Sequence, residues 1–162
     1  MKKIINKLLP LLLLVFITNC AGYEPIFNSQ NLKFKITKYS IEGDKLLGKK
    51  IYSKLINLTK KSSQDDRGIT LLLNITKDNQ TANKSSAGNI LEYKIVLNTK
   101  IAMKDSITDK EIINENYNYS LNYKVQDQYS ETTKLENKAI DDLIDKTYQE
   151  IISKLSQNIL QQ

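Results

Sequence analysis

The sequence predicts an α+β fold, a two-layer sandwich in which a four-stranded mixed sheet carries two helices on one face, in the order β-α-β-β-β-α. Apolar and polar side chains alternate with a period of two over four segments. Two other segments carry apolar side chains every three or four residues, as amphipathic helices do. Each helix buries one stripe and each strand one face, so two helices on one sheet face cover every apolar surface. The opposite face of the sheet is then left polar.

The first two elements are a strand and a helix. Residues 32–36 alternate apolar with polar side chains, and the alternation continues at 39–41 one residue out of phase, so we expect a β-bulge near Thr37. Asp44 is predicted to start the helix. If this helix connects neighbouring strands, those strands are parallel and the sheet is mixed. The apolar stripe of the helix consists of Leu47, Ile51, Leu55 and Leu58.

Three more strands are predicted in the middle of the chain. Residues 69–75 form the second, 91–104 the third and 113–125 the fourth, and a short "DSITDKE" linker makes the last two an antiparallel pair. In these two strands one face is aromatic and aliphatic, while the other carries mostly amide and ammonium groups and is expected to be wet. Residues 77–89, "KDNQTANKSSAGN", have almost no apolar content and are expected to be a functional or mobile loop.

A long helix is predicted to end the chain. Ser130 is the expected N-cap, with Glu131 in the first turn. Its apolar stripe is made by Leu135, Ala139, Leu143 or Ile144, Tyr148, Ile151 or Ile152, Leu155 and Ile159.

The first 19 residues are typical of a lipoprotein signal peptide. Three lysines precede an apolar stretch that is too short for a bilayer, since a membrane helix needs about 20 apolar residues and a signal core about 7–15. Cys20 is the only cysteine and closes this stretch, so we expect removal of residues 1–19 and lipidation of Cys20. The residue before it is Asn19, where Gly, Ala or Ser is usual. The alternative is an ordinary secretory signal with an incidental cysteine.

Processing at Cys20 predicts a simple domain organisation. Residues 20–30 form an acylated tether and 31–162 a single domain. Several acyl chains hold a protein durably on a membrane, because each buried CH₂ contributes about 0.8 kcal/mol. Ala21, which follows the cysteine, favours the outer membrane.

Composition excludes several classes of function. The formal charge of +6 falls to about +3 without the signal lysines, and Arg67 is the only arginine, so nucleic acid is an unexpected partner. The sequence has no histidine, its one cysteine is assigned to lipid, and no glycine-rich phosphate loop is present. The adjacent carboxylate pairs at 65–66 and 141–142 point in different directions. We therefore expect no enzyme activity, no metal site and no cofactor.

Lysines are the remaining candidate ligand contacts. Ammonium groups suit phosphate and carboxylate ligands, and we single out Lys84 in the polar segment and Lys134 near the start of the last helix. Lys100 and Lys104 lie on the predicted wet face. The alternative for any one of them is plain surface solubility.

Three stretches resemble the lipopolysaccharide-assembly lipoprotein family LptE. They are "CAGYEPIF", the segment from "LLLNITKDNQ" through "LEYKIVLNTKIAMKD", and the closing "LENKAIDDLIDKTYQEIISKL". The resemblance covers essentially the whole chain in the same element order. No single motif in it is highly specific.

This resemblance implies a lipoprotein of the outer membrane that sits inside the LptD β-barrel, plugs it, helps it assemble and contacts lipopolysaccharide. Family members bind lipopolysaccharide through basic residues at positions that match Ser86 and Thr132 in this chain, and Lys84 and Lys134 are near neighbours of these two. The alternative function is a stand-alone outer-membrane lipoprotein that binds a small ligand or has a structural role.

Overall fold

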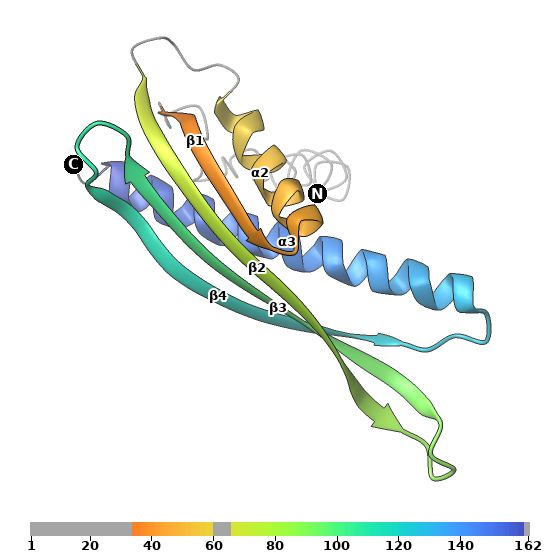
Figure 1. The fold of residues 1–162 in the computed structure, drawn as a ribbon. Helices are drawn as coiled ribbons and strands as arrows, with labels where there is room; N and C mark the ends of the chain where they lie inside the picture. The colour runs from red at the N-terminus through yellow and green to blue at the C-terminus, as the bar shows by residue number, and fades with distance from the viewer. Residues whose placement is uncertain (1–33, 60–65, 161–162) are drawn as a thin grey trace, which may run out of the picture.

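The protein is a mixed four-stranded sheet with two helices, as the sequence predicts. The computed structural model describes residues 34–59 and 66–160. The chain forms, in order, β1 (Phe34–Gly43), α2 (Lys45–Thr59), β2 (Arg67–Lys84), β3 (Ile90–Asp105), β4 (Glu111–Lys124) and α3 (Tyr129–Leu160) (Figure 1). The predictions for the signal peptide, for Cys20 and for the tether fall outside the described residues.

The strands lie side by side in sequence order, β1-β2-β3-β4. The pair β1/β2 is parallel, because α2 carries the chain back between them, and the other two pairs are antiparallel. The register of β1 against β2 shifts between Ile36 and Lys38, which confirms the predicted bulge at Thr37.

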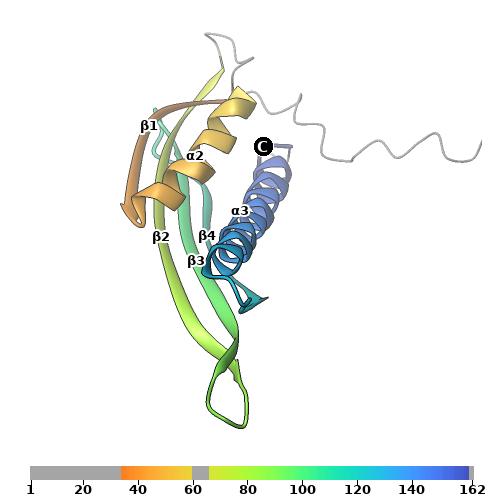
Figure 2. The same cartoon turned by 90° about the vertical axis from the view of Figure 1, so that its right-hand side faces the viewer.

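Both helices pack on one face of the sheet, and the core lies between the two layers (Figure 2). Odd-numbered residues in 69–75 of β2 and in 95–103 of β3 point toward the helices and are almost fully buried, among them Leu71, Ile75, Ile95 and Ile101. The helices contribute Ile51, Leu55, Ile144, Ile151 and Leu155. The predicted apolar faces therefore meet in one core.

A tight corner joins β1 to α2. Gly43 has φ +72°, and a Cβ there would lie 2.1 Å from the Ile75 carbonyl oxygen, so only glycine fits. The Asp44 N–H donates to that same oxygen at 2.7 Å. The Asp44 carboxylate accepts from the N–H groups of Leu46 and Leu47, which confirms it as the N-cap of α2.

The prediction of a loop at 77–89 is wrong. β2 continues to Lys84 and pairs with β3 through partners such as Asp78 with Val96 and Gln80 with Lys94. Only a turn at 85–89 connects the strands, closed by hydrogen bonds between Ser85 and Asn89 and by Gly88 at φ +85°. The segment looks like a loop because this end of β2 is exposed on both faces and carries no apolar alternation.

The predicted cap of α3 is also misplaced. The helix begins at Tyr129, so Ser130 lies inside its first turn. The Glu131 and Thr132 N–H groups donate to the Gln128 carbonyl, and the Thr132 hydroxyl accepts from the Gln126 N–H at 2.8 Å. Thr132, the fourth residue of the helix, thus fixes the position where the chain enters α3, and Ser130 is not needed for this.

Candidate binding surfaces

The sheet face away from the helices is the first candidate surface. We call it the polar face and define it by the even-numbered residues in 70–80 of β2, 92–104 of β3 and 114–124 of β4, together with Lys38, Ser40 and Glu42 of β1. The register places Glu42, Asn74, Lys100 and Asn116 in one row across the sheet. Two residues farther along each strand, on the same face, the Asn118 side-chain amide donates to the Asn98 side chain.

The polar face is largely exposed to solvent, as predicted. Lys100 is exposed on it, and Lys104 lies 3.8 Å from the Asp109 carboxylate. Its apolar exceptions are Leu72, Val96 and Ala102, and Leu72, which is 44% exposed, and Ala102 line a shallow depression of about 190 Å³. Within the described residues no helix covers this face (Figure 2).

The second candidate surface is the hairpin tip, residues 81–92, which extends beyond the helices (Figure 1). Lys84 is exposed there and is the last residue of β2. α3 contacts β2 farther back, where the Lys77 ammonium lies 3.4 Å from the Glu136 carboxylate. Lys84 follows Lys77 by seven residues. At about 3.3 Å per residue, it lies about 20 Å farther along the strand.

Lys134 is exposed on α3, two residues before Glu136. The structure therefore does not bring the two predicted ligand-binding lysines, Lys84 and Lys134, into one site. Any ligand contact that they make must be made separately or by a large ligand.

A groove between β4 and the first turns of α3 is the third candidate surface. This β4–α3 groove has a volume of about 320 Å³, in the range of ligand pockets. Leu121, Leu135 and Ala139 supply its apolar part. Lys124, Lys138 and Asp142 supply its charged rim. Lys134, a predicted ligand contact, precedes Lys138 by one helical turn on the same helix face. The groove therefore places two further lysines, Lys124 and Lys138, close to it.

Tyrosines join the hairpin to β4 on the helix side of the sheet. The rings of Tyr93 and Tyr123 stack with their centroids 5.6 Å apart, and the Asn79 amide donates to the Tyr123 hydroxyl at 2.9 Å. Burial raises the pKa of Tyr123, and this hydrogen bond partly offsets the rise. The stacked rings and the hydrogen bond to the Tyr123 hydroxyl therefore hold this end of the sheet together.

A third tyrosine, Tyr117, is buried between β4 and α3. Tyr117 faces Thr99 in the register of β3 and β4, and neither the Tyr117 hydroxyl nor the Thr99 hydroxyl has a hydrogen-bond partner among the residues that the structure describes. Burial raises the pKa of Tyr117 to about 12.

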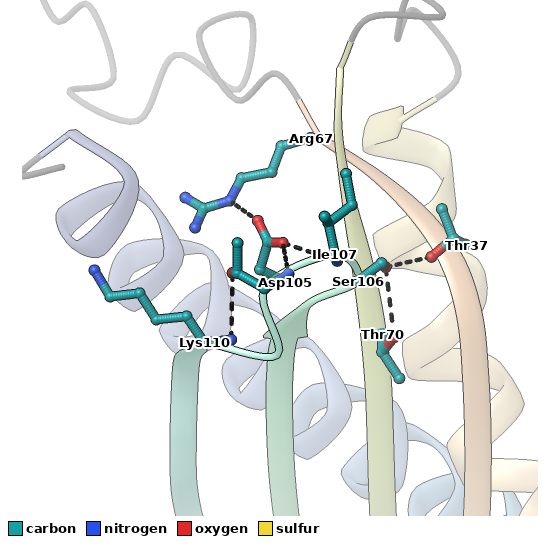
Figure 3. A network of polar contacts seen from close by, with 8 residues as sticks. Thr37, Arg67, Thr70, Asp105, Ser106, Ile107 and Lys110 are labelled. Carbon is teal, nitrogen blue, oxygen red and sulfur yellow. Dashed lines mark hydrogen bonds and ion pairs between the residues drawn. The ribbon is translucent and has the colours of Figure 1, made fainter.

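A polar network at the other end of the sheet holds the β3–β4 turn (Figure 3). The Asp105 carboxylate accepts from the N–H groups of Ile107 and Thr108 at 2.9 Å and from the Arg67 Nε at 2.6 Å. The Thr108 N–H, the Arg67 guanidinium and the Ile107 N–H hold the pKa of Asp105 well below its ordinary value. The Ser106 hydroxyl pairs with those of Thr37 and Thr70. These contacts tie the turn to β1 and β2, and they give the only arginine, which is half-buried, a structural role.

The carboxylate pair on α3 does not converge. Asp141 pairs with Lys50 of α2 at 2.7 Å, whereas Asp142 faces the β4–α3 groove. Asp65 lies outside the described residues. Among the residues that the structure describes, no cluster of acidic, histidine or cysteine side chains could hold a metal ion. None of the described helices is both long enough and apolar enough to cross a membrane.

Sequence reasoning missed Lys124 and Lys138 because they are far apart in the chain and only the packing of α3 on β4 brings them together. Lys138 could have been found, since it follows Lys134 by four residues on a predicted helix. Lys124 looked like one more polar residue of an alternating strand.

Comparison with known proteins gives the class of fold. No protein-family model matches the sequence, and no curated protein matches it. Among solved structures, the chain is similar to a Caulobacter crescentus protein described as a lipoprotein, with 12% identity, a TM-score of 0.58 and coverage of 82% of this chain and 94% of that one.

A second similar structure is lipoprotein B from Nitrosomonas europaea, with 11% identity, a TM-score of 0.52 and coverage of 75% of this chain and 83% of that one. The rare lipoprotein B from Shewanella oneidensis gives 12% identity and a TM-score of 0.45, over 76% of this chain and 94% of that one. The first two likenesses show that the chain has the fold of these bacterial proteins.

Proposed function

We propose that the chain is an outer-membrane lipoprotein that acts with an LptD-type β-barrel as plug and assembly factor in the delivery of lipopolysaccharide. The observation that carries the proposal is the polar face. A sheet face that is not covered by its own chain is expected to be either apolar and covered by a partner, or polar and in contact with water. A polar face of this size suits a chain that is enclosed by the hydrated lumen of a large barrel.

Three further observations support the proposal. The start of the sequence matches the pattern of a lipoprotein signal followed by Cys20. Two solved structures with this fold are described as lipoproteins. Two of the three sequence stretches that resemble the LptE family correspond to the hairpin and to α3, the two elements that carry Lys84 and Lys134.

The alternative, a stand-alone lipoprotein that binds a small ligand, requires an enclosed apolar pocket. A wider groove, about 570 Å³ between α2 and α3, is lined mainly by charged side chains, including the ion pairs Lys50–Asp141 and Lys54–Asp145. Such a groove is poor at excluding water from a small apolar ligand, so the barrel partner is favoured.

The direct test is purification from outer membranes. The full-length chain with a C-terminal affinity tag is solubilised in mild detergent, and the recovered proteins are identified by mass spectrometry. We expect one large β-barrel in stoichiometric amount and a triacylated Cys20 at the mature amino terminus. Recovery of the chain with no barrel would contradict the proposal. A Cys20→Ala variant is the matched control and is expected to lose the membrane fraction.

A further inference from the structure

The outer side of β4 is an open strand edge, and the direction of its backbone groups can be assigned. The Val125 N–H donates to the Leu91 carbonyl at 2.9 Å, so Val125 faces β3. Successive residues of a strand point these groups to opposite sides. The register has no shift between Ile113 and Lys124, so even-numbered residues from Asn114 onward turn their N–H and C=O groups away from β3. Within the described residues no strand pairs with that side.

The β4 edge lacks the features that block strand pairing. Natural sheets protect their edges with charges, prolines and bulges. The other edge strand, β1, has a bulge at Thr37 flanked by Lys35 and Lys38. In β4, by contrast, the segment Asn116–Tyr123 reads "NYNYSLNY", with no charge and no proline, and it has no register shift. This edge is therefore competent to pair with another strand.

The β4–α3 groove runs along this same edge. It is lined by residues of both faces of β4, such as Leu121 and Asn122, so it opens beside the strand and not on one face of the sheet. A strand added to an edge gains main-chain hydrogen bonds, and adjacent pockets select its alternate side chains. The apolar part of the groove suits one aliphatic or aromatic side chain of such a strand.

Charge identifies the chemistry of the occupant. Lys124 and Lys138 line the groove and Lys134 lies one turn away, and within the described residues none of the three forms an ion pair. Asp142 is the one acidic side chain in the lining. The surplus of positive charge favours an acidic segment. A second copy of this chain that paired through its own β4 edge would instead bring another Lys124 to the site and add positive charge.

We propose that the outer edge of β4 is a strand-addition site. It takes an extended segment of the barrel partner as a fifth strand, with an apolar side chain in the β4–α3 groove and an acidic residue against Lys124 and Lys138. This inference rests on the proposed function. The pairing segment is not one of the strands that form the barrel wall, because the strands of a closed barrel have no free edge to offer.

Ser120 provides the sharpest test. Its side chain is exposed on the polar face, and its N–H points away from β3, so Ser120→Pro removes an outward donor and no hydrogen bond of the β3–β4 ladder. The full-length chain, Ser120→Pro and the control Ser120→Ala are purified from outer membranes, and the recovered barrel is quantified. We expect Ser120→Ala to match the unmodified chain and Ser120→Pro to recover about tenfold less barrel, as the loss of one or two hydrogen bonds implies.

The outcomes separate the two proposals. Equal recovery with Ser120→Pro overturns the strand-addition site and leaves the proposed function standing. No barrel with the unmodified chain overturns the proposed function and this inference with it. A stable dimer of the purified chain that Ser120→Pro dissociates assigns the edge to self-association and likewise overturns the inference.

Two measurements keep the test valid if Ser120→Pro unfolds. Lys138→Glu changes only the groove charge and is expected to reduce barrel recovery several-fold, whereas Lys110→Glu in the distant β3–β4 turn is not. Amide exchange at Asn118, Ser120 and Asn122 is expected to be about tenfold slower in the barrel complex than in the chain alone. Unchanged exchange at these amides overturns the inference.

Discussion

Asp105 fixes the β3–β4 turn through both of its carboxylate oxygens. One oxygen accepts from two backbone N–H groups of the turn and the other from the Arg67 guanidinium. All three donors favour the charged carboxylate, so they lower its pKa in the folded state. The only arginine of the chain therefore has a structural task, which leaves recognition of anions to the lysines.

The lowered pKa of Asp105 predicts a pH dependence of stability. A carboxyl with a depressed folded-state pKa contributes stability above its unfolded pKa of about 4, and this contribution is lost as the pH falls toward the folded value. Thermal unfolding of the full-length chain between pH 7 and pH 2 should show a falling midpoint below about pH 4. Asp105→Asn should lower the midpoint at pH 7 and flatten its acid dependence. An unchanged pH profile in Asp105→Asn would contradict the assignment.

The buried Tyr117 hydroxyl has no hydrogen-bond partner in residues 34–59 and 66–160, and this predicts a substitution that does not destabilise the fold. Burying an unpaired polar group costs about 1–3 kcal/mol. Tyr117→Phe should therefore be neutral or should raise the free energy of unfolding by about 1 kcal/mol, as measured in urea. Burial raises the folded-state pKa of Tyr117 to about 12. The contribution of its protonated form to stability is therefore fully present below the ordinary tyrosine pKa near 10 and is lost as the pH rises through about 12. A clear loss of stability in Tyr117→Phe at pH 7 would show that the hydroxyl has a partner.

At the scale of elements, the sequence predicts best where one face of an element is buried. The alternation in β3 and β4, the bulge at Thr37 and the cap at Asp44 are all confirmed, because burial or a backbone hydrogen bond requires a particular residue type there. The same reasoning fails at 77–84, where β2 is exposed on both faces and only main-chain pairing holds the strand. It also fails to join Lys124 to Lys138, because that contact depends on how α3 crosses β4.

The hairpin predicts a gradient of amide protection along β2 and β3. Near Leu73 the strands are buried under the helices, whereas around Thr81 and Tyr93 they are covered on one side at most. Amides of the hairpin tip should exchange at least about tenfold faster than those of β2 near Leu73. Hydrogen exchange read out by NMR or mass spectrometry checks this, and uniform protection along β2 would contradict it.

The separation of Lys84 from Lys134 predicts independent effects on ligand binding. Lys84→Gln and Lys134→Gln should each weaken lipopolysaccharide binding to the full-length chain by about two- to threefold, as modest exposed charge contacts do. Their free-energy effects should add in the double variant, because sites more than about 10 Å apart without shared partners are additive. Lys110→Gln is the control and should bind normally. Strong non-additivity would contradict the separation of the two lysines.

At the scale of the whole molecule, two surfaces remain unexplained by the fold alone. The polar face has no cover among the described residues, and the β4 edge next to it has no paired strand. Both are explained at once if a larger protein surrounds the sheet and contributes a strand to it. The sequence predicts the polar face from alternation, but it does not predict the open edge, because strand order and backbone direction come from the register.

The most direct test of this account is the accessibility of the polar face in the native membrane. With Cys20 acylated, Lys100→Cys places the only reactive thiol at an exposed position on the central strand β3. A maleimide should label this thiol completely in the purified chain and at least about tenfold more slowly in intact outer membranes, where we expect the barrel to enclose it. Equal labelling in both preparations would contradict the enclosure of the polar face.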